Sequence, residues 1–232
     1  YLIKLHKFFK FLYKLKLPFL KRLIPSLIKR VFFINKIQII ELSFGKIEID
    51  LTQSIDREIY LNGFYEKDQL IFLEKACNKN EVTHFLDIGA NIGYYSLFFN
   101  NIKNIYAFEP NKDNFLKLKK NCDLNNRNIK TYNFGLSNIN SESKIWYSNK
   151  NKMGGSAIFD KNDPELKKYD TKNINKEKIF IKKLDDILDI KNEKILVKID
   201  VERHEKKVLE GMEKIILQNG IIMQIEISDL QK

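Results

Sequence analysis

The stretch from Phe85 to Leu97, FLDIGANIGYYSL, sets a short apolar run, a turn of small residues and a second apolar run one directly after another. Residues 83–88 predict a buried strand, because the run is short and apolar and contains β-branched residues. Gly89 to Gly93 predicts a tight turn, and residues 94–99 predict the start of a helix. A strand, a glycine turn and a helix in this order form the nucleotide-binding corner of an open α/β sheet.

The chain beyond this corner alternates predicted strands and helices. Apolar runs predict strands over 104–108, 129–134, 179–181, 195–199 and 221–227, with an edge strand over 144–147. Helical spacing of apolar residues predicts helices over 111–121 and 204–218, and a short one over 184–188. This alternation predicts an α/β fold with a mostly parallel sheet and helices on both faces.

The residues before the corner predict a smaller set of elements. Alternating apolar and polar residues over 37–42 and 46–51 predict a β-hairpin. Residues 55–65 predict an irregular connector, and 65–77 a helix that leads into the corner strand. We therefore expect residues 37–232 to form one domain, with the hairpin and helix in 37–82 and a Rossmann-like core in 83–232.

The positive charge is concentrated in one segment. Residues 1–36 hold ten Lys and Arg residues and no Asp or Glu, and removing those ten from the 41 basic residues leaves 31 against 30 acidic residues. The body of the chain is thus nearly neutral. A protein that grips nucleic acid with its catalytic face would carry positive charge across that body, so we expect no nucleic-acid partner.

Residues 1–36 are predicted to form a basic amphipathic segment. Leu2, Leu5, Phe9 and Leu12 fall on one side of a helical projection, opposite Lys4, Lys7, Lys10 and Lys14. Pro18 is expected to end this helix, and Pro25 to interrupt a second basic stretch over 21–30. Charges break every apolar run, which excludes a membrane span. Residues 1–30 suit the surface of an anionic membrane, and the alternative is a solvated helix packed on protein.

Two cysteines, Cys77 and Cys122, lie in separate predicted helices without the spacing of metal ligands. This usage predicts a reduced, cytoplasmic protein. Together with the basic segment, it predicts a peripheral position at the inner membrane surface.

The glycine corner selects among nucleotide cofactors. The dinucleotide fingerprint needs three glycines, and here Gly89 is followed by Asn91 and Tyr94 at the other two positions, which disfavours NAD. S-adenosylmethionine suits the pattern better: Asp87 or backbone carbonyls can pair with its ammonium, and Glu109, at the end of the second strand, can bind its ribose diol. The alternative is a structural turn with surface acids.

Three segments together resemble the FkbM family of S-adenosylmethionine-dependent methyltransferases. They are DIGANIG over Asp87–Gly93, FEPN over Phe108–Asn111 and KIDVERHE over Lys198–Glu205. The resemblance covers about residues 50–228 and implies a Rossmann-like methyltransferase fold. It also implies O-methylation of a sugar hydroxyl in a glycan, a lipopolysaccharide or a related natural product.

The same resemblance implies the cofactor-binding residues. They are Asp87, Gly89, Ala90, Asn91, Gly93 and Glu109, with Asn111 and the turn from Asn133 to Gly135 near the adenosine. The sequence departs from the family in two ways. Arg203 stands where the family usually has Gly, which reshapes the turn after Asp200 or adds a cation at the substrate mouth. The family fold also continues into a final antiparallel pair of strands, so we expect the C-terminal strands to be missing, in a fragment or a shortened variant.

Asp200, Glu202 and His204 are the candidate catalytic residues. They follow a predicted buried strand, so they emerge at the carboxyl edge of the sheet, where ligands bind. A sugar hydroxyl is a poor nucleophile that benefits from a general base, and each of the three is a candidate. For His204 the alternative is a structural role at the start of a helix. No metal site is assigned, although Asp200 and Glu226 are a pair that could hold a divalent cation.

Two other functional classes stay open. A nucleic-acid (RNA) methyltransferase is disfavoured by the neutral body and by Asp200-Val-Glu-Arg where base-modifying enzymes commonly have an Asn/Asp-Pro-Pro-Tyr/Phe run. A non-catalytic protein that retains the fold is the other class. The acceptor is not identified, and we expect its selection to depend on residues 138–178 and on the mouth around Arg203.

Overall fold

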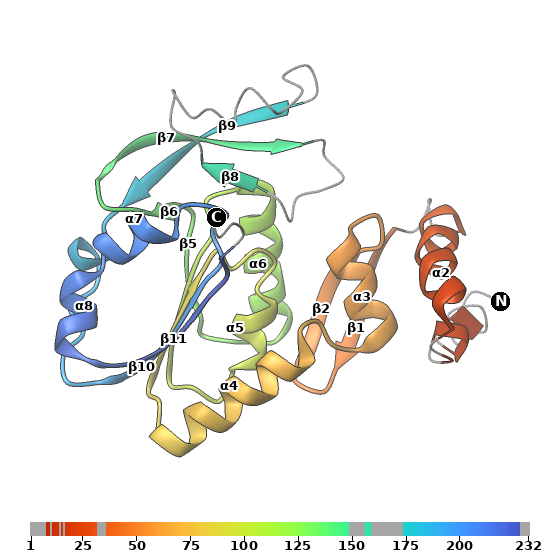
Figure 1. Ribbon diagram of the computed structural model, residues 1–232, viewed down its shortest axis with the longest axis horizontal. Coiled ribbons are helices and arrows are strands. Elements are labelled where there is room, and N and C mark those ends of the chain that lie inside the picture. The colour runs from red at the N-terminus through yellow and green to blue at the C-terminus, as the bar shows by residue number, and fades with distance from the viewer. Residues whose placement is uncertain are drawn as a thin grey trace. The chain divides into compact units, whose positions relative to one another are not determined.

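The computed structural model describes residues 8–9, 11–13, 15, 17–31, 36–148, 156–158 and 174–227. The chain divides into two compact units, Tyr1–Gln69 and Leu70–Lys232. Helices and strands of both units are labelled in Figure 1. Among the described residues, no helix combines the length and the apolar character needed to cross a membrane.

The first unit contains helices α2 (Pro18–Val31) and α3 (Ser54–Asn62) and the antiparallel hairpin of β1 (Ile37–Leu42) and β2 (Gly45–Asp50). The hairpin confirms its prediction. Two other expectations were wrong: α2 continues through Pro25, and α3 occupies the predicted connector. A proline inside a helix removes one hydrogen bond and crowds the carbonyl four residues earlier, and α2 accommodates both at Pro25. Residues 8–9 and 11–13 of the predicted first helix are helical, and most of its remainder lies outside the described residues.

The second unit is built on a five-stranded parallel sheet (Figure 1). Its strand order is β11 (Gly220–Ile225), β10 (Lys194–Ile199), β3 (His84–Ile88), β4 (Asn104–Phe108) and β5 (Lys130–Tyr132). Each strand matches a predicted apolar run to within a few residues. The chain runs from β3 outward to β4 and β5, and then returns to place β10 and β11 on the other side of β3. The strand order therefore reverses beside β3, which opens a crevice at the carboxyl ends of the central strands.

Helices cover both faces of the sheet, as the alternation predicted (Figure 1). On one face α6 (Lys112–Leu124) packs Leu118 and Cys122 against Ala107 of β4. On the other face α7 (Glu205–Glu210) and α8 (Glu213–Gln218) contribute Val208 and Ile215 to the larger core, which centres on β3, β4 and β10. Helix α5 (Tyr94–Phe98) follows the glycine turn, and α4 (Lys67–Asn80) precedes β3.

A single helix was predicted over 204–218, but the structure has two. Gly211 lies between α7 and α8, and a Cβ at this position would lie 1.9 Å from the backbone oxygen of Ser137. The backbone of Gly211 therefore packs directly against the segment after β6 (Gly135–Leu136). The helix is interrupted at this glycine, between α7 and α8. This contact joins residues far apart in the sequence, so helical periodicity alone does not reveal it.

A second sheet of four strands adjoins this core. Its order is β6, β9 (Ile174–Lys182), β7 (Ser141–Ser148) and β8 (Ser156–Ile158). The strand predicted over 144–147 lies within β7, but its prediction as an edge strand was wrong, because β7 pairs with β9 on one side and with β8 on the other. The short helix predicted over 184–188 is a 3-10 turn, η3 (Leu184–Asp186). Of the expected acceptor-selecting segment over 138–178, residues 149–155 and 159–173 lie outside the described residues.

Candidate active site

A pocket lies at the carboxyl edge of the parallel sheet. Its walls come from the ends of β3, β4 and β10, from β6 and β7, and from α6. The lining residues are Ile88, Gly89, Asn91, Phe108, Glu109, Pro110, Asn114, Gly135, Leu136, Ile145, Asp200, Val201, Glu202 and His204. The pocket therefore combines the glycine corner with the segment that follows β10, two stretches more than a hundred residues apart in the sequence.

The glycine corner is fixed to both neighbouring strands. The backbone N–H groups of Gly89 and Ala90 both donate to the oxygen of Phe108, at 3.0 Å each. Gly89 has a φ of 81°, and a Cβ there would lie 1.9 Å from the backbone oxygen of Asp200. Only glycine fits this place, because the close approach of the β10 end leaves no room for a side chain and the left-handed backbone adds a cost of about 1 kcal/mol.

Glu109 is buried at the pocket wall and is oriented by the backbone. Its Oε2 accepts a hydrogen bond from the N–H of Asn91 at 2.8 Å, and its Oε1 accepts one from the N–H of Asn111 at 2.9 Å. Burial raises the pKa of this carboxyl to about 7, against the lowering effect of these hydrogen bonds and of one from the Asn114 side chain. Glu109 thus ties the glycine turn to the start of α6 and presents a carboxyl group to the pocket.

Asp87 and Asp200 are connected through Lys198. Strands β3 and β10 pair Asp87 with Lys198 in register, and the Lys198 ammonium lies 2.9 Å from Oδ2 of Asp200. Asp87 is fully buried; Ser96 Oγ donates to its Oδ2 at 2.6 Å, while its Oδ1 has no hydrogen-bond partner among the residues that the structure describes. Burial raises the pKa of Asp87, and the Lys198 charge opposes that rise. The Lys198 ammonium also lies 4.8 Å from the ring centre of Tyr95.

The turn after β10 has an unusual backbone. Glu202 and Arg203 have φ values of 43° and 71°, in the left-handed region that costs a non-glycine residue about 1 kcal/mol. Arg203 therefore adopts a backbone conformation that suits glycine better than a residue with a side chain. Strained residues of this kind persist where the surroundings hold them, often at functional sites.

His204 follows this turn and is buried at the pocket wall. Its Nε2 lies 3.0 Å from Oγ of Ser137, which comes directly after β6. The backbone of Ser137 also receives the close contact of Gly211. The imidazole is therefore held from a second part of the chain, while its residue begins α7.

The predicted site residues separate into two groups. Those that line the pocket are Gly89, Asn91, Glu109, Gly135, Asp200, Glu202 and His204. Those that do not line it are Asp87, Ala90, Gly93, Asn111 and Asn133.

Two residues of the second group, Asn111 and Asn133, support the walls of the pocket. Asn111 caps α6 by accepting the N–H of Asn114, and its amide donates to Glu177 of β9. Asn133 is exposed, and its amide donates to the backbone oxygens of Glu109 and Pro110. Both asparagines therefore shape the turn that carries Glu109.

Sequence reasoning missed several polar residues of the site. Lys198, Ser96, Ser137 and Asn114 had no predicted role. A signal existed for Lys198, since it precedes Asp200 by two residues and so projects from the same face of its strand. The sequence held no signal for Ser96 or Ser137. Ser96 acts through its contact with Asp87, and Ser137 through its contact with His204, and neither contact follows from a local pattern. Within the described residues, no group of three His, Cys, Asp or Glu side chains is arranged to hold a metal ion.

Comparisons with known proteins agree with this geometry. Residues 87–232 match the Methyltransferase FkbM domain. The chain is also 27% identical, over 169 residues, to the hexuronic acid methyltransferase AglP of Haloferax volcanii, an alignment that covers 69% of this chain and 62% of the relative. The chain thus spans less than two thirds of that relative's length. No solved structure matches the chain.

Proposed function

The chain belongs to the FkbM methyltransferase family, and from this membership we propose that it transfers a methyl group from S-adenosylmethionine to a hydroxyl group of a sugar. The name of the Haloferax relative supports a hexuronic acid as the first acceptor to test. The nearly neutral body of the chain supports a sugar over a nucleic acid.

The observation that carries this proposal is the composition of one pocket. Gly89 and Glu109 line it from the cofactor corner, and Asp200, Glu202 and His204 line it from the segment after β10. A methyl transfer needs donor and acceptor sites that meet, because much of the rate comes from holding the reacting atoms in line and away from water. The pocket brings both sets of groups together.

The residues of the corner fit S-adenosylmethionine. When bound, the cofactor supplies an electrophilic methyl group on a sulfonium. The Asp87 carboxyl is held within the corner by Ser96 and by the neighbouring Lys198 without lining the pocket, and Gly89 leaves the backbone bare for a close approach. Glu109 is already oriented by two backbone N–H groups and would accept hydrogen bonds from the ribose hydroxyls. The Asn114 side chain donates a further hydrogen bond to the same carboxyl.

The acceptor side requires a group that takes a proton. An alcohol loses its proton as its oxygen forms the new bond to carbon, so the base must lie within hydrogen-bond reach of that oxygen. We assign this role first to His204, since its ring lines the pocket and imidazole accepts protons near neutral pH. Asp200, oriented by Lys198, and Glu202 would bind and orient the acceptor hydroxyls.

The direct test uses the full chain with S-adenosylmethionine carrying a labelled methyl group and a glycoside of a hexuronic acid. We expect S-adenosylhomocysteine and a labelled sugar whose methyl group survives mild alkali, as a methyl ether does. Calorimetry should detect binding of the cofactor, and Glu109→Ala should weaken that binding roughly tenfold or more, as expected for loss of a charged acceptor.

Three results would each contradict a separate part of the proposal. Absence of cofactor binding at millimolar ligand would refute the S-adenosylmethionine assignment. Unchanged affinity in Glu109→Ala would remove the ribose assignment alone. A label released by mild alkali would show transfer to a carboxylate instead of a hydroxyl, which would also remove the need for a base.

A further inference from the structure

The first 36 residues carry ten basic side chains and no acidic one, and the proposed methyl transfer uses none of them. We propose that this segment docks the protein on the surface of a membrane that contains anionic lipids. The inference is independent of the proposed function, because it depends on residues outside the pocket.

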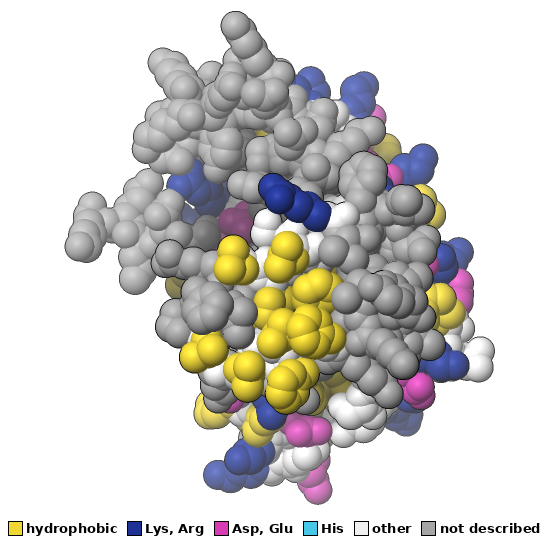
Figure 2. Space-filling model, turned by 90° about the vertical axis from the view of Figure 1, so that its right-hand side faces the viewer, with side chains coloured by type: hydrophobic (Ala, Val, Ile, Leu, Met, Phe, Trp, Pro, Cys, Tyr) yellow, Lys and Arg dark blue, Asp and Glu magenta, His cyan; other side chains and the backbone are white. Residues whose placement is uncertain are grey.

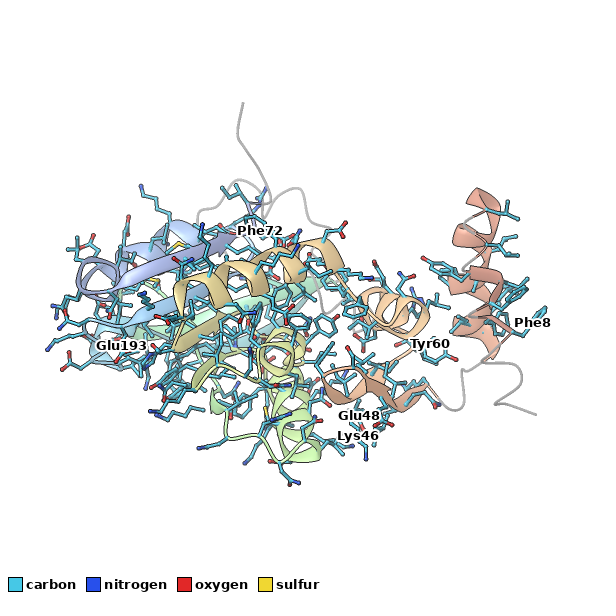
Figure 3. All side chains as sticks on the ribbon, turned by 90° about the horizontal axis from the view of Figure 1, so that it is seen from below. Phe8, Lys46, Glu48, Tyr60, Phe72 and Glu193 are labelled. Atoms are coloured by element: carbon cyan, nitrogen blue, oxygen red, sulfur yellow. The ribbon has the colours of Figure 1, made fainter. Side chains whose placement is uncertain are left out.

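Large apolar side chains are exposed in this segment. Each of them keeps between 43% and 61% of its surface accessible: Phe8, Phe11, Leu15, Leu17, Leu23 and Leu27. Figure 2 shows hydrophobic side chains gathered in one patch, with a basic side chain at its edge. Figure 3 shows the Phe8 side chain pointing outward from its helical turn. We call the six residues the N-terminal apolar patch; large apolar side chains exposed together on one segment mark interaction sites, unlike single ones scattered over a surface.

Helix α2 buries only part of its apolar face. Leu23, Ile24, Leu27 and Ile28 lie on one side of the helix, because neighbouring positions and positions four apart share a face. Ile24 and Ile28 are buried, whereas Leu23 and Leu27, each one residue earlier, are exposed. The exposed edge of this apolar face favours docking over the solvated alternative.

The charge of the segment selects the partner. Aromatic and leucine side chains flanked by Lys and Arg are the composition of helices that lie in the interface of an anionic bilayer. A protein partner would have to be strongly acidic to match ten positive charges, since the segment has no carboxylate to pair with basic groups. The contact that we propose is with the surface of the bilayer, and no described helix is long and apolar enough to cross it.

Sedimentation with vesicles tests the proposal on the full chain. We expect binding to phosphatidylcholine vesicles that contain about 30% phosphatidylglycerol, little binding to phosphatidylcholine alone, and loss of binding as salt rises well above about 0.1 M. The double variant Phe8→Ser/Phe11→Ser should weaken binding to the anionic vesicles roughly tenfold or more. The matched control is Phe72→Ser on α4, whose side chain is 70% exposed and labelled in Figure 3, and it should bind like the unchanged chain.

The outcomes separate the possible partners of the patch. Equal binding to both kinds of vesicle, or an equal effect of the control and the double variant, would overturn the proposal. So would a concentration-dependent dimer in light scattering that the double variant abolishes while vesicle binding is absent, because the patch would then join two copies of the chain. Equal circular dichroism spectra and thermal midpoints establish that the variants stay folded.

Discussion

The ammonium of Lys198 lies 2.9 Å from a carboxylate oxygen of Asp200, and the same lysine pairs in register with Asp87 on the neighbouring strand. One positive charge therefore serves the fully buried carboxyl of Asp87 in the glycine corner and the carboxylate of Asp200, which lines the pocket. The Lys198 side chain is 7% exposed and that of Asp200 is 35% exposed. The two halves of the pocket are thus electrostatically coupled through a residue that does not line it.

Replacing Lys198 with methionine should destabilise the protein by roughly 1–3 kcal/mol, because a buried carboxyl and a half-buried carboxylate lose their counter-charge. Urea unfolding measures this change. The control is Lys191→Met, which breaks the Lys191–Asp189 pair at 2.8 Å between exposed side chains and should change stability by no more than about 0.5 kcal/mol. Equal effects of the two variants would show that burial does not govern the Lys198 pair.

Gly89 can be tested against a glycine with the same backbone conformation. Gly63, at the end of α3, has a φ of 77° and no atom within 4 Å of a built Cβ, so Gly63→Ala should cost only about 1 kcal/mol for the left-handed backbone. Gly89 has a φ of 81°, and the Cβ that Gly89→Ala adds would also clash with the Asp200 backbone, so the end of β10 would have to move. We expect it to cost about 2 kcal/mol more in denaturant unfolding. A similar loss in both would refute the close-approach argument.

Glu109 should make stability depend on pH. Its folded-state pKa is raised to about 7, so between its ordinary value near 4.5 and 7 the folded chain holds a proton that the unfolded chain has released. Stability contributed by this group is then present below about pH 4.5 and falls as pH rises to about 7. The difference in unfolding free energy between the unchanged chain and Glu109→Gln should vary with pH across this window. The exposed Glu74→Gln variant controls for loss of one carboxyl, and a flat difference for Glu109→Gln would contradict the prediction.

Most of the fold could be predicted because apolar periodicity is local. The parallel strands are short apolar runs, and the helices on both faces follow from their spacing in the sequence. Helix α3 was missed although the sequence holds one of its signals: Gly63, which ends it in a left-handed conformation. The division of the last predicted helix could not be anticipated, because Gly211 is required by a backbone contact with Ser137.

The site was predictable only as far as its motifs extend. The corner and the segment after β10 indicated that Glu109 and Asp200 would be close, since both follow parallel strands of one sheet. The positions of Asn111 and Asn133 behind the pocket depend on side-chain bonds that the motif does not specify. The position of Lys198 beside Asp87 depends on the register between β3 and β10, and the sequence of either strand alone does not determine that register.

The bond between His204 and Ser137 offers a way to test positioning apart from binding. Ser137→Ala removes the hydroxyl that lies 3.0 Å from the imidazole Nε2 but leaves the backbone contact with Gly211 in place. If His204 accepts the hydroxyl proton, the ring loses its orientation, so kcat should fall by about tenfold while the affinity for S-adenosylmethionine stays unchanged. The pH profile of kcat should shift as well, because the hydroxyl no longer bonds the ring. Ser54→Ala, at an exposed position in α3, is the control for loss of a hydroxyl. Unchanged kcat and an unchanged pH profile in Ser137→Ala would restrict this histidine to the start of α7.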